Sequence, residues 1–267
     1  MKTLRRLIAR TVVSCALLAL PAHAAEAPAI SAKDLAAQLS ALQQDGSSFV
    51  RLKLSAKPAA GAAKFSLQLQ IKQRRTQGST EVVYQVLWPK ERLGEAVLVK
   101  QSGNGAASGA LFTPPNTVRT LNAAQMKEAL FGSDLSYADV VENFFAWDNQ
   151  TLGGTEVVDR VNCQILESKP GKGQRSTYSG VRTWVDARRL VPLRIEKYLP
   201  SGALARRLDT RDVATDDRGR SVPANLTVTS PQQGSTTDLE GSKLKHGVAL
   251  TDRDFTPEGI KEITTPR

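Results

Sequence analysis

Cysteine and histidine are almost absent from this sequence of 267 residues, and their scarcity excludes whole classes of chemistry. The two cysteines are Cys15, inside an apolar N-terminal run, and Cys163. Once that run is removed, no pair remains for a disulfide bond within the chain. The two histidines are His23, beside the same run, and His246 in the loop-like stretch KLKHGV. A histidine-based zinc site or a Ser-His-Asp triad would therefore have to use His246.

Sequence motifs of common enzymes are also missing. The patterns HExxH, GxSxG, CxxC, Walker and GxGxxG do not occur. The glycine-rich stretch GNGAASG (103–109) lacks the lysine and the following helix that phosphate binding needs, so it indicates a hairpin tip. Cys163 alternates with apolar neighbours and is expected to be a buried strand residue rather than a reactive thiolate. The sequence predicts a protein that is not an enzyme and that needs no metal or cofactor.

Carboxylates leave one enzymatic alternative open. Asp134, Asp139 and Glu142 lie on or near one segment, and a hydrolase of the glycosidase type needs only a pair of carboxylates. Asp139 is better explained as a helix-capping residue and Glu142 as a solvated one. A carboxylate-pair hydrolase therefore stays as a rival, to be recognised by turnover that a single Asp or Glu substitution abolishes.

The N-terminus has the features of a secretory signal peptide. Lys2, Arg5, Arg6 and Arg10 form a basic region, an apolar run follows, and Ala22-His23-Ala24 is a small-x-small cleavage site. We expect cleavage after Ala24, which leaves residues 25–267 as a single exported domain in the periplasm. The stretch VVSC offers a minor alternative, in which Cys15 carries a lipid anchor.

Charge and hydropathy narrow the classes of partner. No later stretch is long and apolar enough to span a bilayer. The formal net charge is +10, but acids and bases alternate in stretches such as ARRLVPLRIEKY, which is typical of a solvated strand surface. No nucleic-acid recognition motif is present, so nucleic acid is not an expected partner.

The pattern of apolar residues predicts mainly strands. The stretch 31–44 has apolar residues at helical spacing and Ser31 as its N-cap, whereas KFSLQLQIK (64–72) alternates strictly. About ten or eleven antiparallel strands follow in this way, with 155–169 taken as one strand. Two more helices are expected, at 122–131 and 136–147, the second with a Ser136/Asp139 capping box. Such strands need a cover for one apolar face, so we predict a mainly β (α+β) fold: a strongly curved sheet, or unclosed β-barrel, with helices as a lid on its concave face.

Aromatic residues make up only 5% of the chain, yet five of them fall within 131–147. The expected helix there either plugs an ordinary core or closes a cavity for an apolar ligand, and periodicity alone leaves both readings open. For a cavity, the strand residues predicted to line it are Phe65, Leu67, Leu69, Val82, Tyr84, Val86 and Trp88. The residues predicted to come from the lid are Tyr137, Val141, Phe144 and Phe145. A one-residue error in strand register would turn a whole set to solvent.

Six stretches in order resemble the LolA/LolB-like lipoprotein-carrier superfamily, in its outer-membrane lipoprotein-sorting branch. They are WPKERLGEAVLV, LFTPPNTVRTL, FGSDLSYADVVE, CQILESKP, TWVDARRLVPLRIEKYLPSGAL and DRDFTPEGI. Together they cover about residues 85–260. The most specific are Gly132-Ser133-Asp134 followed by Ser136-Tyr137, and Trp184-Val185-Asp186 leading to Pro192-Leu193.

The resemblance implies an unclosed antiparallel barrel whose helical lid covers a hydrophobic cavity. It also implies a non-catalytic carrier that binds lipid or lipoprotein acyl chains, possesses no cofactor and acts as a monomer between an inner-membrane exporter and an outer-membrane acceptor. Better-studied carriers hold the lid with a basic residue at a strand end. Arg74 and Arg75 fall about there, although the proline that usually follows is absent, so a plain charged turn is the alternative. The rival on the same fold is a periplasmic sensor or scaffold that binds a protein partner.

Overall fold

The computed structural model describes residues 30–59, 63–103 and 105–266. Contacts divide the chain into two units, Met1–Ile30 and Ser31–Arg267, and the second carries the fold described below. The predicted signal peptide and Cys15 lie outside the described residues. Within the described ranges, no helix has the length and apolar character needed to cross a bilayer.

The second unit consists of one α-helix, short 3-10 helices and β-strands. The α-helix is α1 (Ala32–Gln43). The strands are β1 (Gly46–Lys57), β2 (Phe65–Arg75), β3 (Ser79–Trp88), β4 (Ala96–Ser102), β5 (Ser108–Thr113), β6 (Thr117–Leu121), β7 (Asn149–Val158), β8 (Val161–Lys169), β9 (Gly180–Asp186), β10 (Val191–Tyr198), β11 (Leu204–Thr215), β12 (Ser221–Ser230) and β13 (Ser235–His246). The 3-10 helices are η1 (Lys90–Arg92), η2 (Gln125–Lys127), η3 (Leu130–Gly132), η4 (Phe144–Ala146), η5 (Asp252–Phe255) and η6 (Gly259–Lys261).

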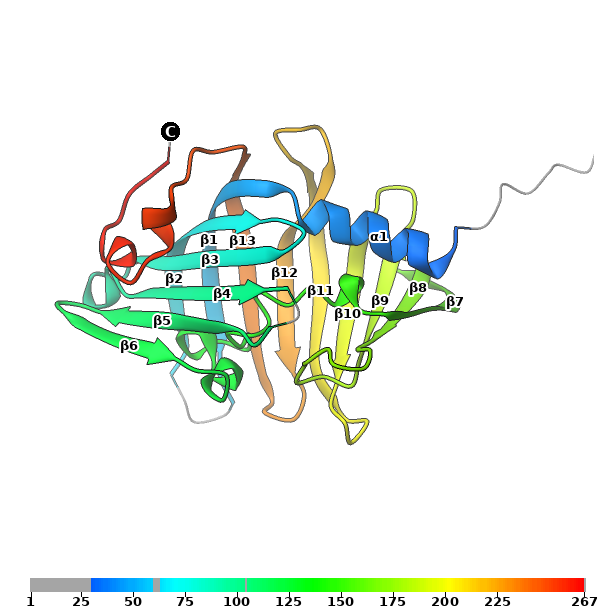
Figure 1. Ribbon diagram of the computed structural model, residues 1–267. Helices are drawn as coiled ribbons and strands as arrows, with labels where there is room; N and C mark the ends of the chain where they lie inside the picture. The colour runs from blue at the N-terminus through cyan, green and yellow to red at the C-terminus, as the bar shows by residue number, and fades with distance from the viewer. Residues whose placement is uncertain (1–29, 60–62, 104, 267) are drawn as a thin grey trace, which may run out of the picture. The chain divides into compact units, whose positions relative to one another are not determined.

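The strands form one antiparallel sheet that curves without closing. Its order is β6-β5-β4-β3-β2-β1-β13-β12-β11-β10-β9-β8-β7, so β6 and β7 are the two edges. The first and last strands of the chain, β1 and β13, pair in the middle and join an N-terminal half to a C-terminal half. Figure 1 shows β4–β6 at one end of this unit, β7 and β8 at the other, and α1 lying across the strands β8–β11. The predicted fold class, mainly β with an unclosed curved sheet, is confirmed.

The structure has more strands than predicted because one predicted strand is a hairpin. The stretch 155–169 turns back on itself between β7 and β8, where Asp159 (φ 47°) and Arg160 (φ 66°) form a two-residue turn. Tight hairpin turns of this kind need positive φ, and the residues that usually signal them are Asn and Gly. Asp-Arg gives no such signal in the sequence.

Helix α1 forms where the sequence predicts it. The Ser31 hydroxyl accepts a hydrogen bond from the backbone N–H of Asp34 (3.1 Å), which satisfies one of the free donors of the first turn. Leu35, Ala36 and Leu39 are buried on one side of the helix. This amphipathic face fixes α1 against the inside of the sheet.

The order of the strands places one long connection on the inner, concave face. Strands β6 and β7 follow each other in the chain but lie at opposite edges, so residues 122–148 have to travel across the sheet. We call residues 122–148 the crossing segment. Its side chains from Met126 to Val141 pack on the inner faces of β2, β3 and β4. The segment therefore forms an inner layer over the N-terminal half of the sheet.

The two helices predicted within the crossing segment are wrong. Only the short 3-10 helices η2, η3 and η4 occur there, and Phe131 (φ 54°) lies in the left-handed region. The Ser136/Asp139 bonds do form: Ser136 N–H donates to Asp139 (2.8 Å), and Asp139 N–H donates to the Ser136 hydroxyl (3.2 Å). They close a single turn instead of starting a helix. An α-helix advances 1.5 Å per residue, so the more extended path suits a segment that must span the sheet.

The C-terminal residues cover the outer face of the N-terminal half. We call residues 248–266 the C-terminal strap. Phe255 and Ile260 are fully buried against Val83, Leu98 and neighbouring apolar residues of β3–β5. The buried side chain of Lys72 donates to Asp254 (2.9 Å), with the two groups forming a salt bridge. These contacts give β2–β4 a cover on both faces.

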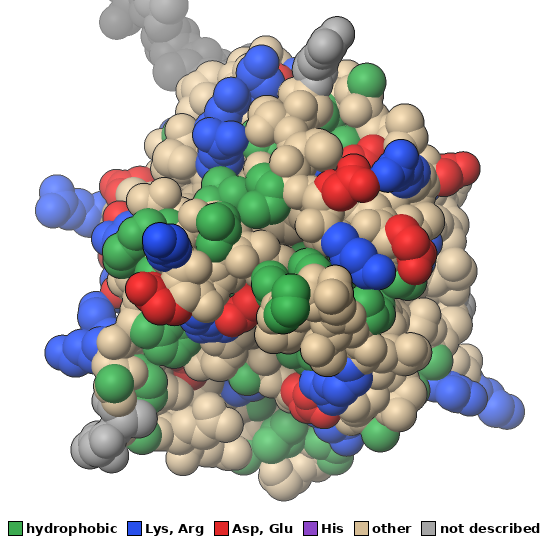
Figure 2. Space-filling view, turned by 90° about the vertical axis from the view of Figure 1, so that its left-hand side faces the viewer, with side chains coloured by type: hydrophobic (Ala, Val, Ile, Leu, Met, Phe, Trp, Pro, Cys, Tyr) green, Lys and Arg blue, Asp and Glu red, His purple; other side chains and the backbone are tan. Residues whose placement is uncertain are grey.

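Elsewhere the outer face also carries the alternating charges that the sequence predicts. Cross-strand pairs such as Lys53–Glu240 (3.3 Å) and Arg182–Glu167 (2.7 Å) line it. At the end formed by β4–β6, Figure 2 shows hydrophobic side chains in small separate groups among charged side chains of both signs. Charge is therefore dispersed over this surface.

The strap provides the first prediction. Phe255→Ala should lower the free energy of unfolding by about 3–5 kcal/mol, because it leaves a void beneath a fully buried ring. Ile263→Ala is the control, since Ile263 is exposed and its loss should cost less than about 0.5 kcal/mol. Urea unfolding followed by circular dichroism measures both. Equal small effects would show that the strap does not stabilise the sheet.

Candidate functional site

Most of the predicted cavity residues on β2 and β3 lie on the inner face but face a filled space. Leu67, Leu69 and Val86 are buried together with Leu54, while Phe65 and Tyr84 are partly buried beside Phe131 of the crossing segment. Val82 packs in the neighbouring cluster with Tyr137. The predicted strand register is therefore right for these six residues. What role they have in binding stays a prediction.

Trp88 is the exception, and its predicted place in the cavity is wrong. A bulge in β3 shifts the register, so that Val86 faces Leu69 but Trp88 faces Gln68. One extra residue turns the following side chains to the other face of the sheet. Trp88 consequently lies on the outer side with 51% of its surface exposed.

The residues predicted to form one lid helix separate into two groups. Tyr137 and Val141 pack on Ile71 and Val82 in the N-terminal half. Phe144 and Phe145 belong to η4, which contacts α1 and β8 in the C-terminal half. Their rings are 4.4 Å apart, and Phe145 faces the space under α1.

Unfilled space lies on the inner face of the C-terminal half. A large cavity of about 450 Å³ extends between β1, β12 and β13, and a small cavity of about 250 Å³ lies between α1 and β10–β12. The two share Val222, Pro223 and Leu226, so they are neighbours. Apolar residues that line them include Leu39, Leu42, Val50, Leu52, Phe145, Ile195, Leu208, Leu239 and Leu244. The large cavity falls in the size range of small-molecule sites, about 300–1,000 Å³.

Sequence reasoning missed this region. In β11–β13 the inner residues Leu208, Leu226 and Leu239 are isolated leucines between polar residues, so their pattern is weaker than that of β2. They are only partly buried in the structure, which fits side chains that face empty space. A run of half-buried apolar residues cannot be told from solvent-facing ones by alternation alone.

The crossing segment is fastened to the sheet by a buried ionic centre, made of Asp139, Glu142, Tyr178, Lys197 and Arg206. Lys197 of β10 donates to Asp139 at 2.6 Å, and both side chains are at least 96% buried. Tyr178 donates its hydroxyl to the same oxygen of Asp139 (2.9 Å). Two further charged groups complete the centre. Arg206 lies 3.7 Å from Asp139, and Glu142 lies 3.9 Å from Lys197.

The pKa values of the two carboxyls of this centre are shifted in opposite directions. Burial alone would raise the pKa of Asp139, but the charge and hydrogen bond of Lys197 and the bonds from Ser136 outweigh it and lower that pKa to about 2. Burial raises the pKa of Glu142, which the more distant Lys197 ammonium only partly offsets. Asp139 is therefore the charged anchor of the crossing segment at neutral pH.

A second anchor lies five residues earlier in the same segment. Asp134 is 96% buried, its carboxylate accepts hydrogen bonds from Ser235 (2.5 Å) and Thr237 (2.7 Å), and its N–H donates to Thr237 (3.0 Å). Both partners are on β13. The resemblance singled out Asp134 within FGSD, and the structure gives that residue a positioning role for the crossing segment.

Arg74 and Arg75, predicted as candidates to hold the lid, lie on opposite faces. Arg74 pairs with Glu81 (2.5 Å) and Asp252 (2.8 Å) on the outer face, so it contacts the strap and not the crossing segment. Arg75 donates to the backbone carbonyl of Val140 (2.6 Å) in the crossing segment. The structure thus rules out Arg74 for the lid and places Arg75 against it.

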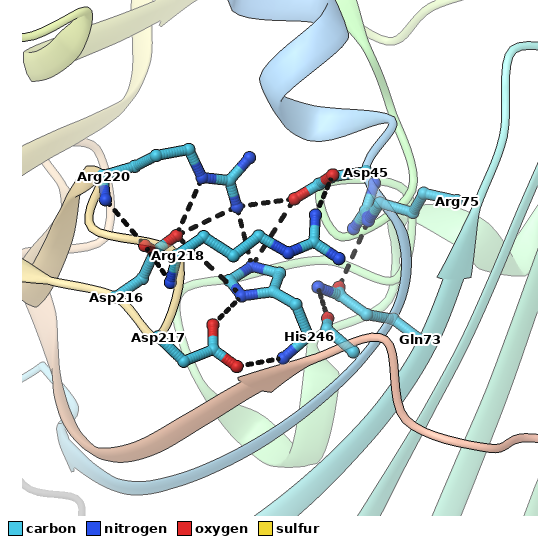
Figure 3. A network of polar contacts seen from close by, with 9 residues as sticks. Asp45, Gln73, Arg75, Asp216, Asp217, Arg218, Arg220 and His246 are labelled. Atoms are coloured by element: carbon cyan, nitrogen blue, oxygen red, sulfur yellow. Dashed lines mark hydrogen bonds and ion pairs between the residues drawn. The ribbon is translucent and has the colours of Figure 1, made fainter.

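A polar rim borders both cavities and consists of Asp45, Asp216, Asp217, Arg218, Arg220 and His246 (Figure 3). Asp45, just after α1, accepts from Arg218 (2.5 Å) and Arg220 (2.5 Å), which belong to the β11–β12 turn. His246 at the end of β13 contacts Arg220 (3.1 Å) and the Asp217 carboxylate. The rim ties the end of α1 to two strand ends beside the cavities.

The rim contains the one group of potential metal ligands that the described residues bring together. Ligand atoms of Asp216, Asp217 and His246 lie within 4.8 Å of one another. Arg220 already binds Asp216 (2.9 Å), however, and both Asp217 oxygens are engaged with His246. This donor set serves an ion-pair network and does not fit an additional cation.

The comparisons with known proteins identify the family and the fold. A family model described only as an uncharacterized protein matches residues 78–262. The chain belongs to this family. Among curated proteins, none matches the sequence significantly.

Three solved structures are similar over most of their length. A DUF1329 family protein from Desulfovibrio piger has a TM-score of 0.76 and 23% identity, covering 84% of this chain and 95% of its own. A putative outer membrane lipoprotein-sorting protein domain from Vibrio parahaemolyticus has a TM-score of 0.74 and 21% identity. The match covers 85% of this chain and 97% of that domain. A LolA superfamily protein from Nitrosomonas europaea has a TM-score of 0.67 and 20% identity. The match covers 85% of this chain and 98% of that protein. The fold is therefore LolA-like, and the predicted resemblance is confirmed at the level of the fold.

The ionic centre gives the second prediction. A carboxyl whose pKa is lowered on folding stabilises the folded protein at pH values above its unfolded pKa. For Asp139 the unfolded pKa is 3.8 and the folded pKa is about 2, so its contribution is lost as the pH falls through about 2. Asp139→Asn should be less stable than the wild type at neutral pH, and the difference should shrink on acidification through this window. Urea unfolding midpoints measured across the window test this.

Asp252→Asn is the control, because the Asp252 carboxylate is 94% exposed. Its curve should follow that of the wild type at every pH. An Asp139→Asn curve that also runs parallel to the wild type would contradict the assignment of Asp139 as the charged anchor.

Proposed function

We propose that the protein is a non-catalytic periplasmic carrier that holds the acyl chain of a lipid or lipoprotein inside its curved sheet. The observation that supports this most directly is the large apolar cavity, about 450 Å³, with the small cavity beside it under α1. Exclusion of water from an acyl chain contributes about 0.8 kcal/mol per methylene. The leucine and valine side chains in the lining of these cavities are suited to that task.

The proposal places the cargo away from the predicted β2/β3 lining and against α1 and β10–β13. In the N-terminal half, the crossing segment fills the inner face, so its residues act there as a plug. Entry of a longer chain would require movement of the crossing segment or of α1, whose fastenings are the ionic centre and the polar rim. Arg75 and Asp139 are the residues we assign to hold the segment in its closed position.

A carrier role is also consistent with the chemistry of the described side chains. Cys163 is buried in an apolar cluster, and burial raises the pKa of its thiol. His246 is engaged by Asp217 and Arg220. Asp139 and Glu142, two of the three carboxylates of the hydrolase alternative, both lie beside Lys197 in the ionic centre. Cys163, His246 and Asp139 thus each have structural contacts that account for them.

We further propose export by the predicted signal peptide, residues 1–24, as a single domain that acts as a monomer. Its partners would then be an inner-membrane exporter that loads the cargo and an outer-membrane acceptor that receives it. The minor alternative, a lipid anchor at Cys15, would keep the same domain at a membrane surface. Mass spectrometry of the mature N-terminus distinguishes the two.

A scaffold that binds a protein partner remains the second candidate, and one observation favours it. Strand β7 is a ten-residue edge with Leu152 and Val157 exposed, the latter by 66%. Exposed edges can accept an added strand from a partner. A stable protein complex without any lipid in the cavities would support this candidate over the carrier.

The third prediction tests the cavity itself. Leu226→Trp places a large ring where the two cavities meet, and it should weaken binding of an acyl chain about tenfold or more, since it displaces two or three methylenes. Val118→Trp on the exposed β6 edge is the control and should bind like the wild type. Protein purified from the periplasm without detergent is measured by native mass spectrometry, and its organic extract identifies the lipid. A wild-type protein that carries no lipid and takes up no acyl probe would refute the carrier proposal.

A further inference from the structure

Arg75 is a cation on the inner face whose hydrogen-bond partners are all neutral. Its guanidinium donates to the side-chain oxygen of Gln73 (3.2 Å) and to the carbonyl of Val140 (2.6 Å). Among the residues that the structure describes, no carboxylate oxygen lies within 4 Å of it. Its neighbour Arg74, by contrast, pairs with two carboxylates on the outer face. Two adjacent arginines of one strand thus have opposite electrostatic surroundings.

Arg75 is partly buried, and a partly buried charge without a counter-ion is unfavourable, because neutral partners replace only part of the lost hydration. Burial accordingly lowers the pKa of Arg75, even though a guanidinium stays protonated at neutral pH. The other titratable group beside it is Tyr84, and burial raises the pKa of that phenol to about 12, so it carries no negative charge at neutral pH. Among the described residues, the positive charge of Arg75 therefore has no counter-ion in contact with it.

The position of Arg75 connects this charge to the cavity. Gln73, which accepts one of its hydrogen bonds, lines the large cavity, and a dashed line in Figure 3 marks their contact. Val140, which accepts the other, belongs to the crossing segment. Movement of that segment would free a guanidinium donor next to the cavity wall.

The acids of the nearby polar rim do not supply the missing counter-ion. Asp45 and Asp216 are bound by Arg218 and Arg220, and Asp217 is bound to His246. Each of these carboxylates already has a partner within the rim. A negative charge for Arg75 would have to come from outside the described chain.

We propose that Arg75 is the head-group site for an amphiphile with an acidic head group, a carboxylate or a phosphate, whose acyl chain occupies the large cavity. The inference rests on the proposed carrier function and names its class of cargo. In the structure the Val140 carbonyl occupies part of the guanidinium fork. On loading, the acidic head group replaces that carbonyl, because a guanidinium binds an anion through two parallel N–H donors better than it binds a neutral oxygen.

The test compares ligands that share an acyl chain and differ in head-group charge. Oleate and oleyl alcohol form one pair, and dioleoyl phosphatidic acid and dioleoylglycerol form the other. The full-length mature protein is titrated with each by native mass spectrometry. We expect the wild type to prefer the acidic member of at least one pair by about tenfold or more. A preference in the first pair identifies a carboxylate site, and one in the second identifies a phosphate site.

The variants separate charge recognition from fastening of the crossing segment. Arg75→Gln should lose the preference for the acid, so that the affinities for the two members of a pair become equal. Arg75→Lys keeps the charge and should retain part of the preference. Arg74→Gln, on the outer face, is the matched control and should leave the preference unchanged. Thermal unfolding of each variant establishes that it is folded, and a looser crossing segment would alter both ligands of a pair alike.

Two outcomes overturn different statements. If the wild type binds both members of each pair equally well, or if Arg75→Gln keeps the full preference, the head-group assignment is wrong and the carrier proposal stands. If the wild type binds none of the four ligands, the carrier proposal fails together with the assignment.

Discussion

The structure depends on one topological constraint: successive strands β6 and β7 lie at opposite edges of a curved sheet. The 27-residue crossing segment between them has to pass over the inner face, and an unclosed sheet leaves that face open to it. Everything else inside the sheet is arranged around this path. The segment fills the N-terminal half, α1 covers the C-terminal half, and the two cavities remain between them.

Specific polar contacts hold this path in place where apolar packing alone would not define it. The Asp139–Lys197 pair and the Asp134 bonds to β13 attach the segment at two points to strands of the C-terminal half. A broken buried pair leaves an unpaired charge, which strongly disfavours partial displacement of the segment. Such fastenings favour two discrete positions, closed and open, over a continuum. That property suits the proposed carrier function, in which an apolar ligand is held and later released.

Sequence reasoning predicted the fold class and most of the β2/β3 register because strict alternation over KFSLQLQIK leaves little freedom. It failed where local and tertiary signals differ. The capping pair Ser136/Asp139 exists, yet the path across the sheet prevents the helix it would start. The bulge before Trp88 is invisible in an alternating pattern. The cavity residues of β11–β13 and Lys197 were missed because no local pattern distinguishes a lysine that meets a buried aspartate 58 positions away from a lysine on the surface.

The two halves of the sheet also differ in mechanical stiffness. Strands β2–β4 are sandwiched between the crossing segment and the C-terminal strap, so bending them would disturb two packed interfaces. Strands β11–β13 carry a solvated outer face and border empty space inside, so they can change their curvature at little cost in packing. The molecule thus combines a rigid frame with a compliant wall, and under the proposed function the wall is the part that adapts the internal volume to acyl chains of different size.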